Sequence, residues 1–354
     1  MQISIDHLSM TYPTGKQALQ DVTLSLESPS LVGLLGPNGA GKSTLMKLLV
    51  AGLLPTSGSI QVDRRPLLQC ERELKAKLGY LPQTFGLYEE LTVWQFLDYM
   101  AALKGIEDST GAIARAIRDT NLEEKKKCRI RSLSGGQRQR VGIAQAILGD
   151  PSFLIFDEPT VGLDPEERIN FRNLFSRIAQ DKIVLLSTHI IEDVQSVCNQ
   201  LIVIDKGRIL FTGAPARLIQ AAQGHVGVFE EADRREEEGF SVTARVNTSC
   251  GVSCRVVAVQ LPPFAQPVEP TLEDAYMYCV AQGGFDEPVF PFPGGIFPPA
   301  PQPQLLAVHS FDLPWPIGGI LLSGVYHHGQ HVPCPAAAFR HLGRDGSLFY
   351  LHSL

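Results

Sequence analysis

A glycine-rich segment near the N-terminus, GPNGAGKST at 36–44, has the residue types and spacing of a loop that binds phosphate. Gly36, Gly39 and Gly41 let the backbone curl until its N–H groups point inward. Lys42 places a positive charge at the β and γ phosphates of a nucleotide, and the Ser43 hydroxyl is a ligand for Mg²⁺. The segment therefore predicts a nucleotide site that also includes Pro37, Asn38, Ala40 and Thr44.

Two adjacent carboxylates, Asp157 and Glu158, end the apolar segment SFLIFDEP at 152–159. Successive side chains of a strand point to opposite sides, so the two carboxylates are expected to do different work. Asp157 is expected to hold Mg²⁺ through a water, and Glu158 to orient or deprotonate a water that attacks the γ-phosphate. A solvated acidic turn is the alternative, and the buried strand before the pair argues against it.

A second glycine pair, Gly135 and Gly136, lies in LSGGQRQR at the predicted start of a helix. Bare backbone N–H groups and the positive end of a helix dipole favour a phosphate at such a turn. If the first loop holds the phosphates of one nucleotide, the second turn needs another ligand or another chain.

Short apolar runs separated by helical patterns make up the chain from Met1 to about Gly213. The runs are LVGLLG, KLGYLP, SFLIFDEP, KIVLLSTH and LIVIDKG, and the alternating segment MQISIDHLSMTYPTG precedes them as a further strand. This pattern predicts a parallel sheet covered on both faces. The segments VWQFLDYMAALKG and GGQRQRVGIAQAIL have apolar residues three and four apart, which predicts helices with a core-facing stripe.

With both glycine turns and the carboxylate pair in this order and spacing, residues 1–283 resemble the ATP-binding subunits of ABC transporters. The resemblance implies an α/β fold, a P-loop NTPase of ABC type with a mixed sheet core and a helical subdomain. It identifies LSGGQ as the family's signature, a phosphate-binding turn aimed at ATP held by an opposite subunit. The functional core of the turn is then Ser134, Gly135, Gly136 and Gln137, with Arg138 and Arg140 on the helix face.

Four further residues receive roles from the same resemblance. Tyr12 is similar to the aromatic residue that stacks on adenine. Gln83 resembles the glutamine that reaches Mg²⁺ and the attacking water while its loop touches the membrane partner. Asp164 resembles the aspartate that joins two subunits, and His189 the histidine that contacts the γ-phosphate. The alternatives are an exposed tyrosine, a surface glutamine and a core histidine.

The resemblance also implies partners and a location. Two such subunits, identical or closely related, would sandwich two Mg·ATP molecules head to tail and drive a separate integral-membrane permease from the cytoplasmic face of the membrane. The segments QTFGLYEELTVWQFLDYMAALKGI and PTLEDAYMY are most similar to the single-domain ATPases of exporter-type systems, including drug and antibiotic efflux. The cargo itself belongs to the membrane subunit.

Composition limits the other classes of function. The chain has 31 basic and 37 acidic residues without a dominating block, which gives no electrostatic case for nucleic-acid binding. Its seven cysteines show no paired CxxC spacing, which is typical of reduced thiols in a cytoplasmic protein. The N-terminus lacks the regions of a signal peptide, and no apolar run reaches the roughly twenty residues of a membrane helix.

Three zones are expected: an ATP-binding domain over 1–213, a small α+β appendage over 214–283 and a tail over 284–354. In the appendage, Thr271 is expected to cap the helix TLEDAYMYCVAQ. The tail holds 11 of the 25 prolines, 6 of the 9 histidines and no lysine, which predicts a disordered extension or the product of a shifted reading frame. A metal site in YHHGQHVPC would use His327, His328, His331 and Cys334, but no element there fixes their geometry.

Three rival interpretations remain at this point. A soluble ABC ATPase with a non-transport role, on ribosomes or DNA, would be expected to carry two sets of motifs or long heptad repeats, and this chain has neither. A regulatory GTPase or a kinase would leave LSGGQ unexplained. A damaged subunit is the third, although every predicted catalytic residue precedes the tail.

Overall fold

The computed structural model of the chain describes residues 1–233, 239–249 and 251–284. The tail predicted over 284–354 lies outside these residues except for Gly284, and so do the metal ligands considered at His327, His328, His331 and Cys334. Five cysteines fall within the described residues, and all five are free thiols. Among the described helices, none combines the length and the apolar character that a membrane span needs.

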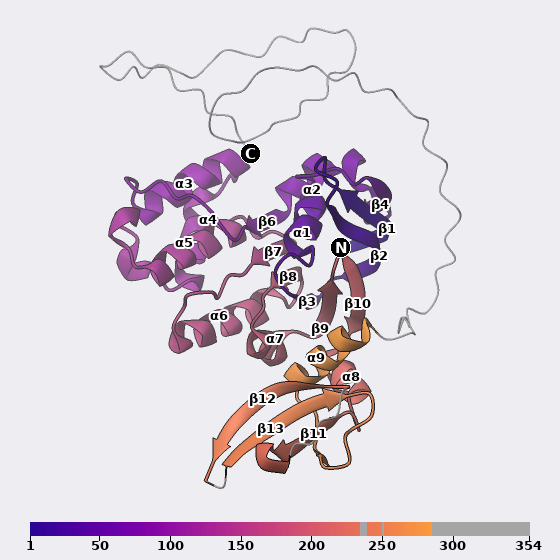
Figure 1. The fold of residues 1–354 in the computed structure, drawn as a ribbon. Helices are drawn as coiled ribbons and strands as arrows, with labels where there is room; N and C mark the ends of the chain where they lie inside the picture. The colour runs from indigo at the N-terminus through magenta and orange to yellow at the C-terminus, as the bar shows by residue number, and fades with distance from the viewer. Residues whose placement is uncertain (234–238, 250, 285–354) are drawn as a thin grey trace. The chain divides into compact units, whose positions relative to one another are not determined.

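A six-stranded sheet forms the centre of the structure, with strand order β10-β9-β3-β8-β7-β6 (Figure 1). Its strands pair in parallel except for β10, which runs antiparallel to β9 and makes the sheet mixed. The apolar runs of the sequence coincide with β3 (Ser30–Leu35), β6 (Leu78–Leu81), β7 (Phe153–Asp157), β8 (Ile183–Ser187) and β9 (Gln200–Asp205), and β10 (Arg208–Gly213) follows.

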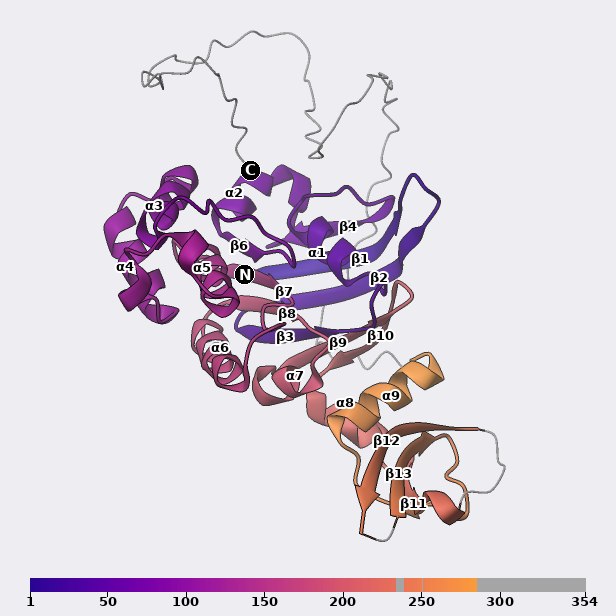
Figure 2. The ribbon, with the colours of Figure 1, turned by 60° about the vertical axis from the view of Figure 1, so that its left-hand side comes forward.

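The two faces of this sheet pack into two different hydrophobic clusters. On β7, Leu154 and Phe156 belong to one cluster while Phe153 and Ile155 belong to the other, because neighbouring side chains of a strand point to opposite faces. The first cluster includes residues of α6 (Pro165–Ile178) and α7 (Ile191–Val197), which Figure 2 shows below the sheet. The second includes α1 (Lys42–Leu49) and an antiparallel sheet.

That antiparallel sheet has strand order β2-β1-β4-β5, and its buried side chains pack with those of α1 in one hydrophobic cluster. Strand β1 alternates as predicted and places Ile3, Ile5 and Leu8 in the core. Short helical segments, η1 (Leu67–Gln69) and α2 (Glu71–Ala76), connect it to β6. Its strands are β1 (Gln2–Thr11), β2 (Gln17–Glu27), β4 (Ser57–Val62) and β5 (Arg65–Pro66).

A helical subdomain lies between β6 and β7, with a hydrophobic cluster of its own. Thr92 caps its first helix, where the hydroxyl accepts a hydrogen bond from the backbone N–H of Gln95 and the Gln95 side chain completes a capping box. The predicted mixed sheet with a helical subdomain is thus confirmed. The subdomain comprises α3 (Val93–Lys104), α4 (Ser109–Asp119), η2 (Glu123–Lys125), η3 (Ile130–Ser132) and α5 (Gly135–Ile147).

The predicted α+β appendage follows β10, and its sheet has strand order β12-β13-β11-β14. Thr271 caps α9 as expected, since its hydroxyl accepts from the backbone N–H of Asp274. Leu272 and Ala275 of α9 belong to the same hydrophobic cluster as the central sheet. The elements are α8 (Pro215–Ala221), β11 (Val226–Glu230), η4 (Glu231–Asp233), β12 (Phe240–Thr248), β13 (Gly251–Ala258), β14 (Gln266–Pro267) and α9 (Leu272–Gln282).

Candidate functional site

The first glycine loop connects β3 to the N-terminus of α1, and its own chain explains why it needs glycine. Gly39 and Gly41 have φ angles of 82° and 114°, in the left-handed region that disfavours side chains. A Cβ at Gly36 would stand 2.2 Å from the backbone oxygen of Ile204, and one at Gly41 would stand 2.6 Å from that of Ala18. The loop therefore curls tightly against its neighbours, as the sequence predicted.

Lys42 folds back over this loop instead of extending into solvent. Its Nζ donates hydrogen bonds to the backbone oxygens of Gly36 at 2.6 Å and Pro37 at 3.2 Å. Burial lowers the pKa of Lys42, while the carboxylates of Glu158 and Asp157 oppose that shift. The ammonium group is thus held at the loop, where the phosphates of a nucleotide can replace the two carbonyl acceptors.

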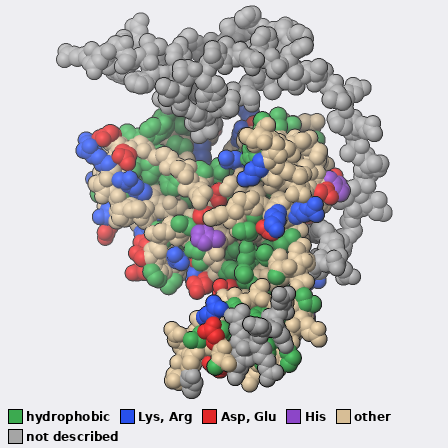
Figure 3. Space-filling model, viewed as in Figure 1, with side chains coloured by type: hydrophobic (Ala, Val, Ile, Leu, Met, Phe, Trp, Pro, Cys, Tyr) green, Lys and Arg blue, Asp and Glu red, His purple; other side chains and the backbone are tan. Residues whose placement is uncertain are grey.

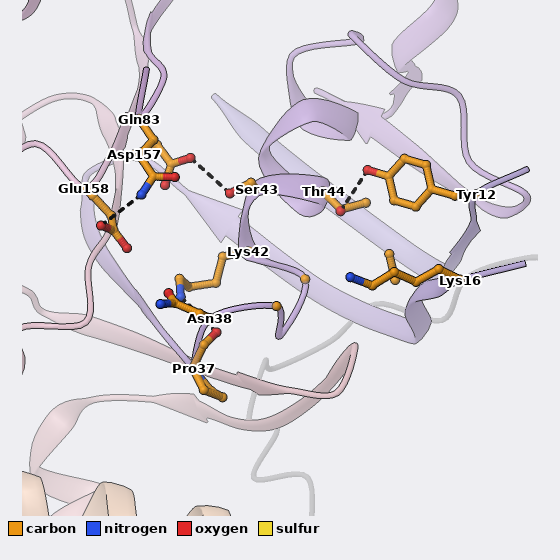
Figure 4. A pocket seen from close by; sticks show the side chains of 13 residues that line it. Tyr12, Lys16, Pro37, Asn38, Lys42, Ser43, Thr44, Gln83, Asp157 and Glu158 are labelled. Carbon is orange, nitrogen blue, oxygen red and sulfur yellow. Dashed lines mark hydrogen bonds between the residues drawn. The ribbon is translucent and has the colours of Figure 1, made fainter. Parts of the chain in front are cut away.

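Ser43 and Asp157 face each other across the gap between α1 and the end of β7 (Figure 4). The Ser43 hydroxyl donates to Oδ2 of Asp157 at 3.2 Å. Burial raises the pKa of Asp157, with a further contribution from the neighbouring Glu158 carboxylate. A hydroxyl and a carboxylate side by side are hard oxygen donors, and Mg²⁺ typically takes one or two such protein ligands and keeps its other positions for water and phosphate.

Glu158 brings together the three residues predicted to be catalytic. Its Oε2 accepts a hydrogen bond from Nε2 of Gln83 at 3.3 Å, and its Oε1 lies 3.3 Å from Nδ1 of His189. The Glu158 side chain is 8% exposed, whereas His189 is 55% exposed. Asp157 and Glu158 do face different partners, but the reason differs from strand alternation: Glu158 lies beyond the end of β7 with φ at 53°.

One cleft of about 320 Å³ is lined by residues of the phosphate loop and by Gln83, Asp157 and Glu158, with Tyr12 at its other end (Figure 4). His189 contacts Glu158 but does not line this cleft. The Tyr12 hydroxyl lies 3.1 Å from Oγ1 of Thr44, so the ring is anchored beside α1. Lys16 and Ala18 also line the cleft and were missed from the sequence. Lys16 is a cation four residues after Tyr12 on the same hairpin, and that proximity was the available signal.

The signature turn does not enter this cleft. Ser134 caps α5, because its hydroxyl accepts from the backbone N–H of Gln137 at 3.3 Å while Gln137 Oε1 accepts from the Ser134 N–H at 3.2 Å. Ser134 and Gln137 line a second cavity of about 420 Å³, together with Asn121, Glu123, Glu124, Lys125, Arg140 and Glu167. Within the described residues, the phosphate loop and the Ser134–Gln137 cap thus line separate pockets.

No close contact within the same chain requires glycine at the two glycine positions of the signature turn. A Cβ at Gly135 would have no heavy atom within 4 Å, and one at Gly136 would be 3.4 Å from Cδ2 of Leu163. Both residues lie in the first turn of α5, and neither has a positive φ. The described part of the chain therefore gives no steric reason for glycine here.

The residues flanking the signature turn link it to its surroundings. Arg138 forms an exposed pair with Glu89, whereas Arg140 forms a partly buried pair with Glu167 and donates to the backbone oxygen of Asn121. Ion pairs thus hold both arginines on the helix, although Arg140 also lines the second cavity beside Ser134 and Gln137. Asp164 caps α6 by accepting from the backbone N–H of Glu167 at 2.9 Å, and it lines neither pocket.

Comparison with known proteins identifies the family. The sequence profile of the ABC transporter family matches residues 19–161. An uncharacterized ABC transporter ATP-binding protein of Bacillus subtilis is 35% identical over 237 residues, covering 66% of this chain and 78% of the relative. The chain belongs to the ABC transporter ATP-binding proteins. Its family membership makes it an ATPase and excludes the regulatory GTPase and kinase interpretations.

Two further comparisons agree with the assignment of the chain to the ABC ATPases. A Nod factor export ATP-binding protein I of Burkholderia pseudomallei is 36% identical over 215 residues, covering 59% of this chain and 70% of the relative. A solved structure of the ATP binding subunit of an ABC transporter superposes with a TM-score of 0.57 at 28% identity, covering 62% of this chain and 93% of that one. The ABC ATPase fold is therefore shared along most of the length of that subunit.

Proposed function

We propose that this ABC ATPase binds and hydrolyses ATP as the motor subunit of a transporter, and that two copies, or this chain and a close relative, sandwich two Mg·ATP head to tail. The observation that carries the proposal is the contrast between the two glycine turns. The phosphate loop needs glycine because of its own neighbours, whereas Gly135 faces open space. A nucleotide held by another subunit supplies the contact that would exclude a side chain at Gly135.

Each nucleotide would then contact two subunits. Lys42 and the loop N–H groups of one subunit bind the phosphates, while Ser134, Gly135, Gly136 and Gln137 of the other subunit approach the γ-phosphate from outside. Tyr12 stacks on the adenine, and Asp164 lies where the subunits meet. ATP contributes contacts to both surfaces, so binding favours the closed pair and hydrolysis removes part of that stabilisation.

Hydrolysis would centre on Glu158, whose two oxygens are oriented by Gln83 and His189. Glu158 accepts a proton from the attacking water as the water oxygen bonds to the γ-phosphorus and the bond to the bridging oxygen breaks, which releases ADP and phosphate. Mg²⁺, held by Ser43, Asp157 and Gln83, would neutralise charge on the phosphates. His189 would contact the γ-phosphate as well as the Glu158 carboxylate, so the orientation of Glu158 would depend on whether the γ-phosphate is present.

The membrane partner would be an integral-membrane permease docked near the loop that follows Gln83. Tyr88 of this loop is 48% exposed, and a Cβ at Gly142 would stand 2.7 Å from the ring of Phe85, so the loop packs closely on α5. A movement of the permease against this loop would therefore be transmitted to α5, the helix that begins at the signature turn. Because a relative is named for Nod factor export, we propose export as the direction, from the cytoplasmic face of the membrane, in the manner of drug and antibiotic efflux ATPases.

We propose no nucleic-acid partner, because basic and acidic residues nearly balance over the whole chain. On the face shown in Figure 3, basic and acidic side chains of the described residues are interspersed. Co-purification of a permease with the chain from detergent-solubilised membranes tests the transporter assignment. If the chain is recovered only in fractions without membranes and still has full ATPase activity, the soluble, non-transport alternative is favoured.

We further propose the division into an ATP-binding domain over 1–213, an appendage over 214–283 and a tail over 284–354. The end of β10 at Gly213 and the start of α8 at Pro215 support the first boundary. Intact mass and limited proteolysis of the expressed protein test these boundaries. A protease-resistant fragment that includes residues after Gly283 would contradict the proposal.

Glu158→Gln tests hydrolysis and dimerisation together. The amide keeps the shape but cannot take a proton, so turnover should fall by about 100-fold or more while ATP binding persists. The variant should therefore accumulate as an ATP-bound dimer in size-exclusion chromatography with light scattering. Glu166→Gln, an exposed neutralisation in the first turn of α6, is the matched control and should keep the wild-type rate. A Glu158→Gln monomer that hydrolyses ATP at the wild-type rate would overturn the proposal.

A further inference from the structure

Asp193 is a buried carboxylate outside the nucleotide cleft. It lies in the first turn of α7, it is 1% exposed, and it lines neither of the two pockets. A charge so deeply buried is tolerated only when it is paired and hydrogen-bonded. Arg172 donates to Oδ1 through Nε at 2.9 Å and Nη2 at 2.6 Å, and Thr160 donates its hydroxyl to Oδ2 at 2.6 Å.

Thr160 connects this carboxylate to the catalytic base. Only Pro159 separates Thr160 from Glu158, whose φ of 53° is strained for a residue with a side chain. The backbone N–H of Leu163 donates to the Thr160 oxygen at 3.3 Å, so Thr160 is fixed at both its hydroxyl and its carbonyl. A strained turn persists only when its surroundings hold it, and the bond from Thr160 to Asp193 is such a support.

The helix that contains Asp193 and its second partner, Arg172, connect it to His189 and Asp164. Helix α7 begins at Ile191, two residues after His189, and Asp193 is its third residue. Arg172 belongs to α6, which Asp164 caps. Helices α6 and α7 pack against each other below the sheet (Figure 2). The segments that carry Glu158, His189 and Asp164 therefore meet at one buried carboxylate.

We propose that Asp193 is a positioning residue for hydrolysis. It fixes the positions of Glu158 and His189 relative to each other and to the start of α6, which Asp164 caps. The proposal rests on the function proposed for Glu158 above. Neither Asp193 nor its partners Arg172 and Thr160 line the nucleotide cleft, so their loss should leave ATP binding largely intact. The loss should instead slow the chemical step, because an orientation error at the base affects only the transition state.

Asp193→Asn keeps the shape of the side chain and removes its charge. We expect kcat to fall by about tenfold or more while the dissociation constant of a fluorescent ATP analogue changes by less than about threefold. Glu192→Gln is the matched control, since Glu192 neighbours Asp193 and lies 4.0 Å from the same Arg172 but is 83% exposed. That control should keep the wild-type kcat. Equal kcat values for Asp193→Asn and Glu192→Gln would overturn the proposal.

A second pair of variants covers the case in which Asp193→Asn fails to fold because Arg172 loses its counter-charge. Thr160→Val removes one hydroxyl from the network and leaves the Arg172–Asp193 pair in place, whereas Thr160→Ser keeps the hydroxyl. Thr160→Val should lose about tenfold in kcat with ATP affinity retained, and Thr160→Ser should recover most of it. Equal losses in both variants, or a loss of ATP affinity parallel to that of kcat, would indicate a packing role and overturn the proposal.

The wild type and Glu158→Gln separate this inference from the proposed function. If the wild type hydrolyses ATP, Glu158→Gln is inactive and Thr160→Val equals Thr160→Ser, then the role of Asp193 alone is refuted. If Glu158→Gln retains the wild-type rate, the proposed function fails, and the role of Asp193 fails with it.

Discussion

The two glycine turns of this ABC ATPase look alike in sequence and differ in what their glycines are for. In the phosphate loop, the left-handed backbone of Gly41 and its closeness to Ala18 require glycine in the isolated chain. In the signature turn, Gly135 has ordinary helical backbone and open space in front of it. Contacts within the chain thus explain the glycines of the phosphate loop, whereas Gly135 is explained only by the nucleotide of a second subunit that we propose. The difference indicates which parts of the ATPase are complete in one subunit.

Gly41→Ala should have the largest effect, because it disturbs both the fold and the nucleotide. A methyl group at a φ of 114° and 2.6 Å from a backbone oxygen costs about 1–3 kcal/mol and displaces the loop. We expect ATP affinity to fall by about 100-fold, since each 1.4 kcal/mol lost from the phosphate contacts costs about tenfold. Gly39→Ala is the comparison, because its Cβ would meet nothing within 4 Å. Calorimetric titration should find the smaller loss for Gly39→Ala, and the reverse order would contradict the steric explanation.

Gly135→Ala should separate stability from activity. Replacing glycine in a helix with alanine stabilises by about 0.4–1 kcal/mol where the backbone allows it, so the melting temperature should stay or rise. ATP turnover should nevertheless fall by about 100-fold, because the methyl group displaces donors at the nucleotide of the other subunit. ATP binding by the single subunit, which uses the phosphate loop, serves as the internal control. Wild-type turnover in this variant would remove the distinction between the two turns.

Ser134→Ala and Thr271→Ala should have the smallest effects and sharpen the comparison. Both residues form capping boxes at the start of a helix, and each loss costs about 1 kcal/mol of stability. Only Ser134→Ala should also lower ATP turnover, by a few-fold. Thermal unfolding and a steady-state ATPase assay on the two variants provide the test. A turnover loss in Thr271→Ala equal to that in Ser134→Ala would assign the whole effect to helix stability.

Local patterns made much of this protein predictable. The phosphate loop, the five parallel strands and the Thr271 cap are encoded in short windows, where spacing and alternation carry the information. The capping box of Ser134 and Gln137 was also visible as a serine three residues before a glutamine, and was missed because the segment was considered only as an anion site.

Other features depend on residues far apart in the chain. Asp193 is linked to Thr160 across 33 positions and to Arg172 across 21, and no local pattern marks such partners. Asp193 differs from the other acidic residue of α7 because it is buried, and that burial comes from the packing of α6 and α7. The φ of Glu158 likewise follows from how the chain leaves β7, which strand alternation did not predict. Lys16 reaches the cleft only through the hairpin between β1 and β2.

Complementation between two inactive variants tests the central claim most directly. Lys42→Ala disables the phosphate loop and Gly135→Ala disables the signature turn, so each variant alone should be nearly inactive. A head-to-tail pair made of one subunit of each has one complete site. Because about half of randomly formed dimers are mixed and each has one of two sites intact, an equal mixture should recover about a quarter of the wild-type ATPase rate. A mixture no more active than the mean of the two variants would contradict the head-to-tail pairing of two copies of this chain.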